Sequence, residues 1–291
     1  MSSPDSGAHP VRAAKDNFGI ECRRPMQENL RAVPAPCLLR TANRTSMLKA
    51  VLFDAAETLI RPWPSYGAVY ARVTAAFGMR IPAEFFAEEM KRAFRAVDWP
   101  LRTTSENEMR LWQEVTKKVY EALPADLPFH EWFGAIYQAF ASADAWVAEP
   151  GAAETLQSLR DIGIRTAVVS NWDERLASVL DGLGLAPLVD RVFVAAQVGW
   201  RKPAREIFLH ACRELGATPA EALHIGDSAS EDVSAARAAG LQALHYRPSD
   251  PTALRRLRGA WPVMQRHRGA PPRRPEVAGA GRSGARRGRP R

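Results

Sequence analysis

The sequence predicts an α/β protein, with a parallel sheet that carries helices on both faces and an all-helical unit inserted after the first strand. The second half of the chain supports the sheet, because short apolar runs alternate there with amphipathic segments of helix length. Another apolar run, residues 48–53, stands alone before a long stretch with helical periodicity. With 291 residues the chain can bury one core and a smaller second unit, and its 46% hydrophobic content is typical of globular proteins.

The two ends of the chain differ from its middle in composition and charge. Residues 1–46 and 258–291 are rich in Ser, Pro, Gly, Ala and Arg without sustained periodicity, so both segments are predicted to be disordered. The net charge is +8, but residues 255–291 hold 12 arginines and one acidic residue, and residues 1–46 add a net +3. The rest of the chain is therefore acidic, with a net charge of −6. Basic character confined to the ends does not indicate nucleic-acid binding by the folded part.

Residues 63–148 are predicted to form a helical cap, because apolar side chains recur there at helical spacing in four stripes. Pro82, Pro100 and Pro124 separate the stripes. The stripes are Tyr66, Val69, Tyr70, Val73 and Phe77; Phe86, Met90, Ala93 and Val97; Met109, Trp112, Val115 and Val119; and Trp132, Phe133, Ile136 and Phe140. Four helices joined by short loops favour a small bundle with these side chains in its core.

Strand–helix alternation begins after residue 149. The predicted order is helix 152–162, strand 165–169, helix 174–183, strand 191–195, helix 203–215, strand 222–225, helix 232–239 and strand 243–246. Gly163, Gly216 and Gly240 end three of these helices, and Pro203 suits the first turn of another. Because the run at 48–53 joins the same sheet, the core is predicted to comprise residues 47–62 together with 149–250.

Polar residues follow four of the predicted strands. They are Asp54, then Ser170-Asn171, then Lys202 just beyond a Gly-Trp-Arg segment, and finally Gly226-Asp227 with Asp232 five residues further on. Ligands of open parallel sheets bind outside the carboxyl ends of the strands, so these four groups are expected to form one site.

This order of motifs resembles that of the haloacid dehalogenase-like hydrolase superfamily, from Met47 to Pro248. The most specific segments are Ser170-Asn171-Trp172-Asp173, Gly199-Trp200-Arg201-Lys202-Pro203 and His224-Ile225-Gly226-Asp227-Ser228 with Asp232. The resemblance implies a Rossmann-like core with a helical cap inserted between the first and second motifs.

The resemblance also implies magnesium-dependent phosphatase chemistry on a small phosphorylated metabolite. Asp54 would attack phosphorus as the nucleophile and form an aspartyl-phosphate. Lys202 and Ser170 would stabilise the transferring group as catalytic and substrate-binding residues. Asp54, the carbonyl of Ala56 and Asp227 would bind Mg²⁺, with Asp232 in support through water or a hydrogen bond. The remaining expected substrate ligands are Thr58 and, through its backbone, Asn171.

The sequence departs from the phosphatase pattern beside the nucleophile. Phosphatases of this family carry a second Asp two residues after the first, which protonates the leaving oxygen and later activates water, but here that position is Ala56. Glu57 occupies a position that is usually Gly in the family. It could be a substitute acid, but a surface or structural role is the favoured interpretation. Hydrolysis of ordinary phosphomonoesters should therefore be slow, or restricted to good leaving groups.

Two alternatives stay open at this point. One is cleavage of a carbon–halogen or carbon–phosphorus bond. Asp227 favours a metal site, whereas carbon–halogen cleavage in this superfamily needs no metal. Carbon–phosphorus cleavage uses a cap lysine, but Lys91, Lys117 and Lys118 are expected on solvated helix faces. The other is a phosphate- or metal-binding protein with little catalysis.

Further features narrow the setting. The chain contains no apolar run long enough for a membrane span, and its three cysteines are too scattered for a disulfide framework, so a cytoplasmic location is expected. The cap would close over the site, with its entrance formed by Trp63, Tyr66, Trp99 and Trp112.

Overall fold

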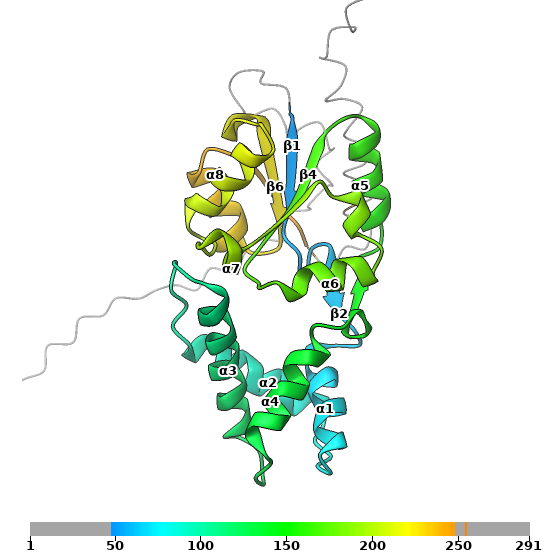
Figure 1. Ribbon diagram of the computed structural model, residues 1–291, viewed down its shortest axis with the longest axis vertical. Coiled ribbons are helices and arrows are strands. Elements are labelled where there is room, and N and C mark those ends of the chain that lie inside the picture. The colour runs from blue at the N-terminus through cyan, green and yellow to red at the C-terminus, as the bar shows by residue number, and fades with distance from the viewer. Residues whose placement is uncertain (1–47, 248–253, 255–291) are drawn as a thin grey trace, which may run out of the picture. The chain divides into compact units, whose positions relative to one another are not determined.

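The computed structural model describes residues 48–247 and residue 254. Five parallel strands form the central sheet in the order β5-β4-β1-β6-β7 (Figure 1). The strands are β1 (Ala50–Phe53), β4 (Arg165–Ser170), β5 (Arg191–Val194), β6 (Ala222–Gly226) and β7 (Gln242–His245). Their carboxyl ends all lie at one edge of the sheet, because the strands run in the same direction.

Helices cover both faces of this sheet. Successive side chains of a strand point to opposite faces, so Val51 and Phe53 enter one apolar cluster while Ala50 and Leu52 enter another. The helices on the first face are α5 (Ala152–Asp161) and α6 (Arg175–Gly182), and those on the second are α8 (Arg205–Glu214) and α9 (Ala235–Ala238). The predicted α/β class, with helices on both faces of a parallel sheet, is confirmed.

Several element boundaries differ from the predicted ones. Helix α8 begins at Arg205, so Pro203 lies in the preceding loop rather than in the first helical turn. A short helix, α7 (Ala195–Val198), follows β5 directly. The predicted helix 232–239 is divided into a π-helix, Ala229–Ser234, and the short α9. The 3₁₀ turns are Ala143–Ala145, Ala186–Leu188 and Pro219–Glu221.

Four helices lie between the first and second strands of the sheet, and we call residues 66–139 the helical insertion. They are α1 (Tyr66–Ala76), α2 (Ala83–Ala96), α3 (Ser105–Tyr120) and α4 (Phe129–Ala139). Ser65 and Thr104 cap α1 and α3, each with its side-chain oxygen accepting from a backbone N–H. An antiparallel ribbon, β2 (Ile60–Pro62) with β3 (Trp146–Ala148), joins the insertion to the core. These three-residue strands are too short to show a period, and the sequence did not predict them.

The interior of the helical insertion is mainly aromatic and aliphatic, as its periodicity predicts. The second stripe is buried throughout, and the largest buried side chains from the other stripes are Tyr70, Val115, Val119, Trp132 and Ile136. The prediction that Met109 belongs to the buried third stripe is wrong, because this residue is 47% exposed. The buried residue in that turn is Glu108, whose carboxylate pairs with an arginine of the core.

The core extends past its predicted end at residue 250. Leu254 is fully buried among the side chains beneath α5, and its carbonyl accepts a hydrogen bond from the Thr155 hydroxyl at 3.0 Å. The predicted disordered segments, 1–46 and 258–291, lie outside the described residues. Among the described helices none is both long and apolar enough to cross a membrane.

Candidate active site

The predicted strand-end residues meet at the carboxyl edge of the sheet. Asp54 directly follows β1, Ser170 is the last residue of β4, and Asp227 directly follows β6. Strands β4 and β6 flank β1, and the Asp54 N–H donates to the Ile225 carbonyl of β6 at 2.8 Å. All three side chains line one cavity.

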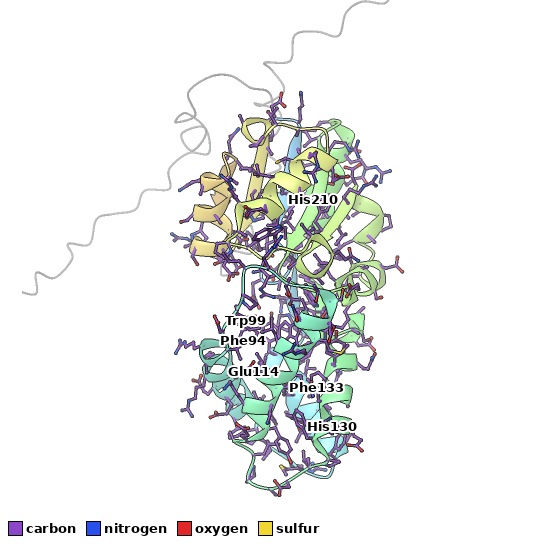
Figure 2. All side chains as sticks on the ribbon, turned by 60° about the vertical axis from the view of Figure 1, so that its left-hand side comes forward. Phe94, Trp99, Glu114, His130, Phe133 and His210 are labelled. Carbon is purple, nitrogen blue, oxygen red and sulfur yellow. The ribbon has the colours of Figure 1, made fainter. Side chains whose placement is uncertain are left out.

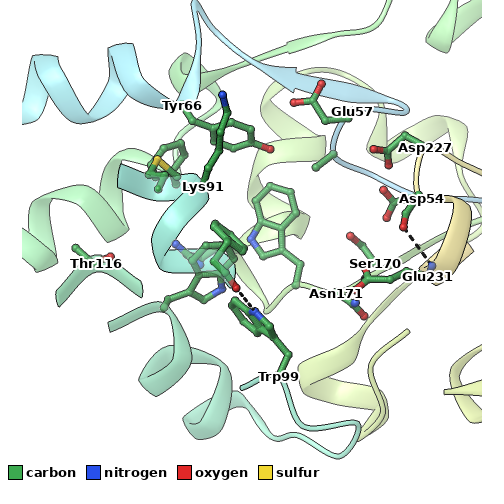
Figure 3. A pocket seen from close by; sticks show the side chains of 18 of the residues that line it. Asp54, Glu57, Tyr66, Lys91, Trp99, Thr116, Ser170, Asn171, Asp227 and Glu231 are labelled. Carbon is green, nitrogen blue, oxygen red and sulfur yellow. Dashed lines mark hydrogen bonds between the residues drawn. The ribbon is translucent and has the colours of Figure 1, made fainter. Parts of the chain in front are cut away.

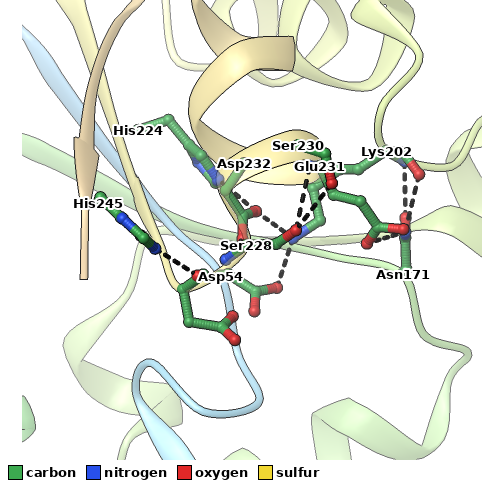
Figure 4. Close-up of polar contacts among 10 residues, drawn as sticks. Asp54, Asn171, Lys202, His224, Ser228, Ser230, Glu231, Asp232 and His245 are labelled. Carbon is green, nitrogen blue, oxygen red and sulfur yellow. Dashed lines mark hydrogen bonds and ion pairs between the residues drawn. The ribbon is translucent and has the colours of Figure 1, made fainter. Parts of the chain in front are cut away.

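Lys202 lies at the centre of the polar contacts (Figure 4). Its Nζ donates to Asp54 Oδ1 and to Asp232 Oδ1, each at 2.6 Å, and the lysine is 4% exposed. Although burial alone would lower it, the two carboxylates raise the pKa of Lys202 above its usual value. The lysine therefore stays charged at neutral pH and neutralises part of the acidic cluster.

Asp232 is held by partners on several sides. Its Oδ1 contacts His224 Nε2 at 2.9 Å and its Oδ2 accepts from the Ser228 N–H at 2.9 Å. Although burial opposes the shift, Lys202 and His224 keep the pKa of Asp232 below its usual value. Gly226 permits this packing, because a Cβ at that position would lie 2.2 Å from the Asp232 carboxyl carbon. Asp232 is thus a fixed negative charge that positions Lys202.

The other two carboxylates of the cluster carry the opposite shift. Burial, opposed by Lys202, raises the pKa of Asp54 to about 6, and burial with the nearby Asp232 raises the pKa of Asp227 to about 6. Ligand atoms of Asp54, Asp227 and Asp232 all lie within 4.8 Å of one another. A cluster of carboxylate oxygens with a single lysine fits a hard divalent cation such as Mg²⁺, whose charge would reduce the cost of ionising both carboxyls.

Asn171 lines the cavity, and its side chain bonds to the backbone of Lys202. Its Oδ1 accepts from the Lys202 N–H at 2.7 Å, while its Nδ2 donates to the Lys202 carbonyl at 2.9 Å and to Glu231 at 3.2 Å. The side chain therefore holds the backbone of the lysine loop. Thr58, also expected to bind substrate, is fully buried and lies outside the cavity lining, and its hydroxyl has no hydrogen-bond partner among the described residues.

Two residues of the turn after Asp54 face the cavity. Ala56 and Glu57 both line it, and the positive φ of 59° at Glu57 is the conformation that glycine adopts most easily. Burial and repulsion by Glu149 raise the pKa of Glu57 above its usual value. In Figure 3 the Tyr66 hydroxyl points toward the side of the pocket where Glu57 and Asp227 lie. Burial raises the pKa of Tyr66 well above its usual value, so this phenol remains protonated.

Two buried ion pairs beside the cavity escaped the sequence analysis. Glu108 of α3 accepts from Arg201 Nη1 at 2.5 and 2.6 Å, and Arg175 forms two hydrogen bonds with Asp173 at 2.8 and 2.9 Å. The motif segments draw attention to Arg201 and Asp173 only as neighbours of Lys202 and Asn171. Apolar periodicity gives no signal for buried charged side chains, so these pairs could not be predicted from it.

The expected cap residues are partly confirmed as lining. Tyr66, Trp99 and Trp112 line the cavity, but Trp63 is 52% exposed and does not. Lys91 also lines it, with a side chain that is 62% exposed and paired with Glu88.

A family model described as haloacid dehalogenase-like hydrolase matches residues 48–240, which is nearly all of the continuous described segment. The chain therefore belongs to the haloacid dehalogenase-like hydrolase family.

Individual relatives agree with this assignment. The chain is 31% identical over 206 residues to haloacid dehalogenase-like hydrolase domain-containing protein 3 of Bos taurus, covering 67% of this chain and 80% of that protein. It is 31% identical over 219 residues to glyceraldehyde 3-phosphate phosphatase of Methanopyrus kandleri, covering 69% and 84%. The structure of L-2-haloacid dehalogenase from Xanthobacter autotrophicus, at 20% identity, has the same fold with a TM-score of 0.51 over 68% of this chain and 77% of that one.

Proposed function

We propose that this hydrolase cleaves phosphate monoesters, with Asp54 as the nucleophile. The observation that carries the proposal is the position of Lys202, whose ammonium bridges Asp54 and Asp232 at the end of a cavity. An anionic carboxylate can approach an anionic phosphoryl group only where cations reduce their repulsion. Lys202 supplies one such cation and is fixed by both carboxylates.

The proposed reaction has two displacements. An Asp54 carboxylate oxygen forms a bond to phosphorus while the ester oxygen leaves with the bonding electrons and takes up a proton. Water then attacks the phosphorus of the aspartyl-phosphate, releasing inorganic phosphate and restoring the carboxylate. Because Lys202 engages Oδ1 of Asp54, the other oxygen is the one available for attack. Ser170, at the end of β4, would donate a hydrogen bond to a phosphoryl oxygen.

A magnesium ion fits the same end of the cavity. The side chains of Asp54 and Asp227 and the carbonyl of Ala56 would hold the ion. Asp232 would support it indirectly, through water or a hydrogen bond. When bound, the ion supplies positive charge to the phosphoryl oxygens.

The absence of a second aspartate shapes the expected activity. At position 56 the methyl group of alanine lines the cavity, and it cannot donate a proton to the leaving oxygen. Esters with good leaving groups, such as acyl and aryl phosphates, should therefore be cleaved faster than alkyl phosphates. Glu57 and the Tyr66 hydroxyl lie on the same side of the cavity and are alternative donors (Figure 3).

Relatives with phosphatase names support this proposal. Besides the glyceraldehyde 3-phosphate phosphatase, a ribulose-1,5-bisphosphate 5-phosphatase of Halopiger xanaduensis is 32% identical over 102 residues, covering 35% of this chain and 43% of that protein. A phosphorylated small molecule is accordingly the proposed substrate class.

The test is a phosphate-release assay of purified protein with a panel of phosphate esters and millimolar magnesium. Asp54→Asn should abolish release, while Asp126→Asn, a change at an exposed aspartate outside the cavity, should leave it unchanged. Trapping phosphorylated protein in the wild type, but not in Asp54→Asn, would identify the nucleophile. Phosphate release that persists in Asp54→Asn would contradict the proposal.

A second candidate follows from Ala56 itself. A site that binds magnesium and phosphate but lacks the acid could serve for binding with little turnover. Calorimetric binding of phosphate with magnesium, combined with no turnover of any ester, would favour this function. Carbon–phosphorus cleavage through a cap lysine has less support, because Lys91 is exposed and already paired with Glu88. Carbon–halogen cleavage without a metal leaves the Asp227 carboxylate in the cluster without a role.

A further inference from the structure

The cavity continues from the carboxylate cluster into the helical insertion. Its volume is about 730 Å³, within the range of sites that hold drug-sized ligands. Asp54 and Asp227 lie at one end, and Thr116 of α3 lies at the other (Figure 3). A phosphoryl group at Asp54 fills only the first end. The remainder, which we call the inner lobe, faces the alcohol part of a phosphate ester.

The walls of the inner lobe are aromatic. Phe94 and Trp99 stack with their ring centres 5.4 Å apart and their planes 23° from parallel, and Trp112 meets both rings edge-on. Figure 2 shows Phe94 and Trp99 at the end of the insertion nearer the sheet, with His130 at the opposite end. Further rings in the lining come from Phe133, Tyr137 and Trp172. Flat apolar surfaces of this kind favour a planar, apolar group.

Of the three arginines that line the cavity, Arg175 and Arg201 are already neutralised by carboxylates. Arg175 binds both carboxylate oxygens of Asp173 and lies 3.5 Å from the centre of the Tyr137 ring. Arg201 binds the fully buried Glu108. Lys91 and Arg95 also line the cavity, but both are exposed. A second anionic group on the substrate would thus lose its hydration without finding a free buried cation.

Several polar groups of the lobe are engaged with one another, while the buried indole N–H groups of Trp112 and Trp172 have no partner among the described residues and offer one donor each. The Trp99 indole N–H donates to the Phe94 carbonyl at 3.1 Å, and the Tyr137 hydroxyl donates to Asp173 at 3.0 Å. At the far end, the Tyr70 and Thr116 hydroxyls form a hydrogen bond of 3.2 Å. A sugar-like alcohol would have to leave several hydroxyls without partners here, which is unfavourable.

We propose that the alcohol part of the substrate is a neutral aromatic group that occupies the inner lobe. This inference rests on the phosphate-ester hydrolysis proposed above, and it separates this chain's substrate from small sugar phosphates and from esters with a second negative charge. The phosphoryl group binds at Asp54 and Lys202, and the ring lies between the aromatic walls of the insertion.

Three esters of primary alcohols test the inference, because their leaving groups have similar acidity. They are naphthalen-2-ylmethyl phosphate, propyl phosphate and 2-carboxyethyl phosphate, with ribose 5-phosphate as the polyhydroxylated comparison. The naphthyl ester should exceed propyl phosphate in kcat/KM by at least about tenfold, as expected when a large apolar group enters a complementary pocket. The carboxyethyl and ribose esters should fall below propyl phosphate. Equal kcat/KM values across the four would overturn the inference.

Two variants connect the preference to the lobe. Phe94→Ala and Phe133→Ala each remove one ring from partly exposed positions, so the fold should tolerate them, and thermal melts would verify this. Each should reduce the ratio of the two kcat/KM values, naphthyl ester over propyl phosphate, by about threefold or more. Trp63→Ala is the matched control, because Trp63 is exposed and lies outside the cavity. A ratio that is unchanged in both phenylalanine variants would contradict the placement of the ring.

A binding experiment separates this inference from the proposed chemistry. Isothermal titration calorimetry of the wild type with naphthalen-2-ylmethanol needs no turnover, and 1-propanol serves as the comparison. If no ester is hydrolysed but the naphthyl alcohol binds, and Phe133→Ala weakens that binding, the lobe assignment holds while the phosphatase proposal fails. If esters are hydrolysed without preference and the alcohol does not bind, the phosphatase proposal holds and the lobe assignment is overturned.

Discussion

Restoring a carboxylate at position 56 is the most direct test of the missing acid. Ala56 is half-buried and lines the cavity two residues after Asp54, so the added group of Ala56→Asp would project into the same space as the substrate. Burial raises the pKa values of the neighbouring Asp54 and Asp227 to about 6, and the same surroundings should raise that of the new carboxyl. A carboxyl that is partly protonated near neutral pH is suited to general acid catalysis.

The size of the gain depends on the leaving group. Positioned acid–base catalysis contributes about 10²–10⁴ in rate, and the neighbouring carboxylates oppose the ionised form needed in the second step, so we expect roughly 10²–10³ in kcat/KM for propyl phosphate. For 4-nitrophenyl phosphate, which needs little protonation, the gain should stay below about tenfold. Phosphate release with magnesium measures both values.

Ala56→Asn is the matched control, since it has the same shape but cannot transfer the proton. A companion change, Glu57→Gly, places glycine at the positive φ of 59° and removes a nearby charge, so the double variant should be at least as active as Ala56→Asp alone. If Asp and Asn at position 56 have the same activity, or if the wild type already hydrolyses propyl phosphate rapidly and Ala56→Asp slows it, another group supplies the proton and the argument fails.

Two further outcomes follow from the geometry. Millimolar magnesium should raise the Tm of the wild type by mass action, with a smaller rise in Asp227→Asn; a Tm that does not respond would argue against the metal site. The rise in Tm should be larger at pH 7.5 than at pH 5, because burial raises the pKa values of Asp54 and Asp227 to about 6 in the folded state. Their protonated forms stabilise the metal-free fold below about pH 4, and this contribution is lost as the pH rises through 6. Above that pH the ionised carboxylates can bind the cation. Glu108→Gln leaves Arg201 buried without its partner, which costs about 3–5 kcal/mol and should lower Tm by roughly 6–20 °C, whereas Glu88→Gln at an exposed pair should leave Tm nearly unchanged; equal melts for both would refute this account.

The sequence predicted the sheet because its signals are local. Each strand is a short apolar run, and the glycines and prolines between elements act on their own backbone, so class and element order follow from neighbours in the chain. The strand-end rule then placed Asp54, Ser170, Lys202 and Asp227 near one another, and the structure brings them to one cavity. The roles assigned to them stay predictions.

What the sequence could not give are contacts between distant segments. Periodicity selected Met109 and passed over Glu108, because the partner that makes this carboxylate stable in the interior lies 93 positions further along the chain. The family resemblance implied Thr58 as a substrate ligand, yet its side chain is fully buried outside the cavity lining. The side-chain bonds of Asn171 to the backbone of Lys202 join positions 31 residues apart, and no local pattern predicts them.

Other contacts between distant segments link the helical insertion to the surroundings of Asp54. The Arg201 N–H donates to the Leu101 carbonyl at 2.8 Å and its guanidinium binds Glu108, so the helical insertion holds the residue immediately before Lys202. From the other side Asn171 holds the backbone of Lys202 itself. The lysine that neutralises Asp54 is therefore positioned jointly by the core and by the insertion whose rings form the inner lobe. A change that shifts the insertion should alter kcat as well as KM, because the cation beside the nucleophile would move with it.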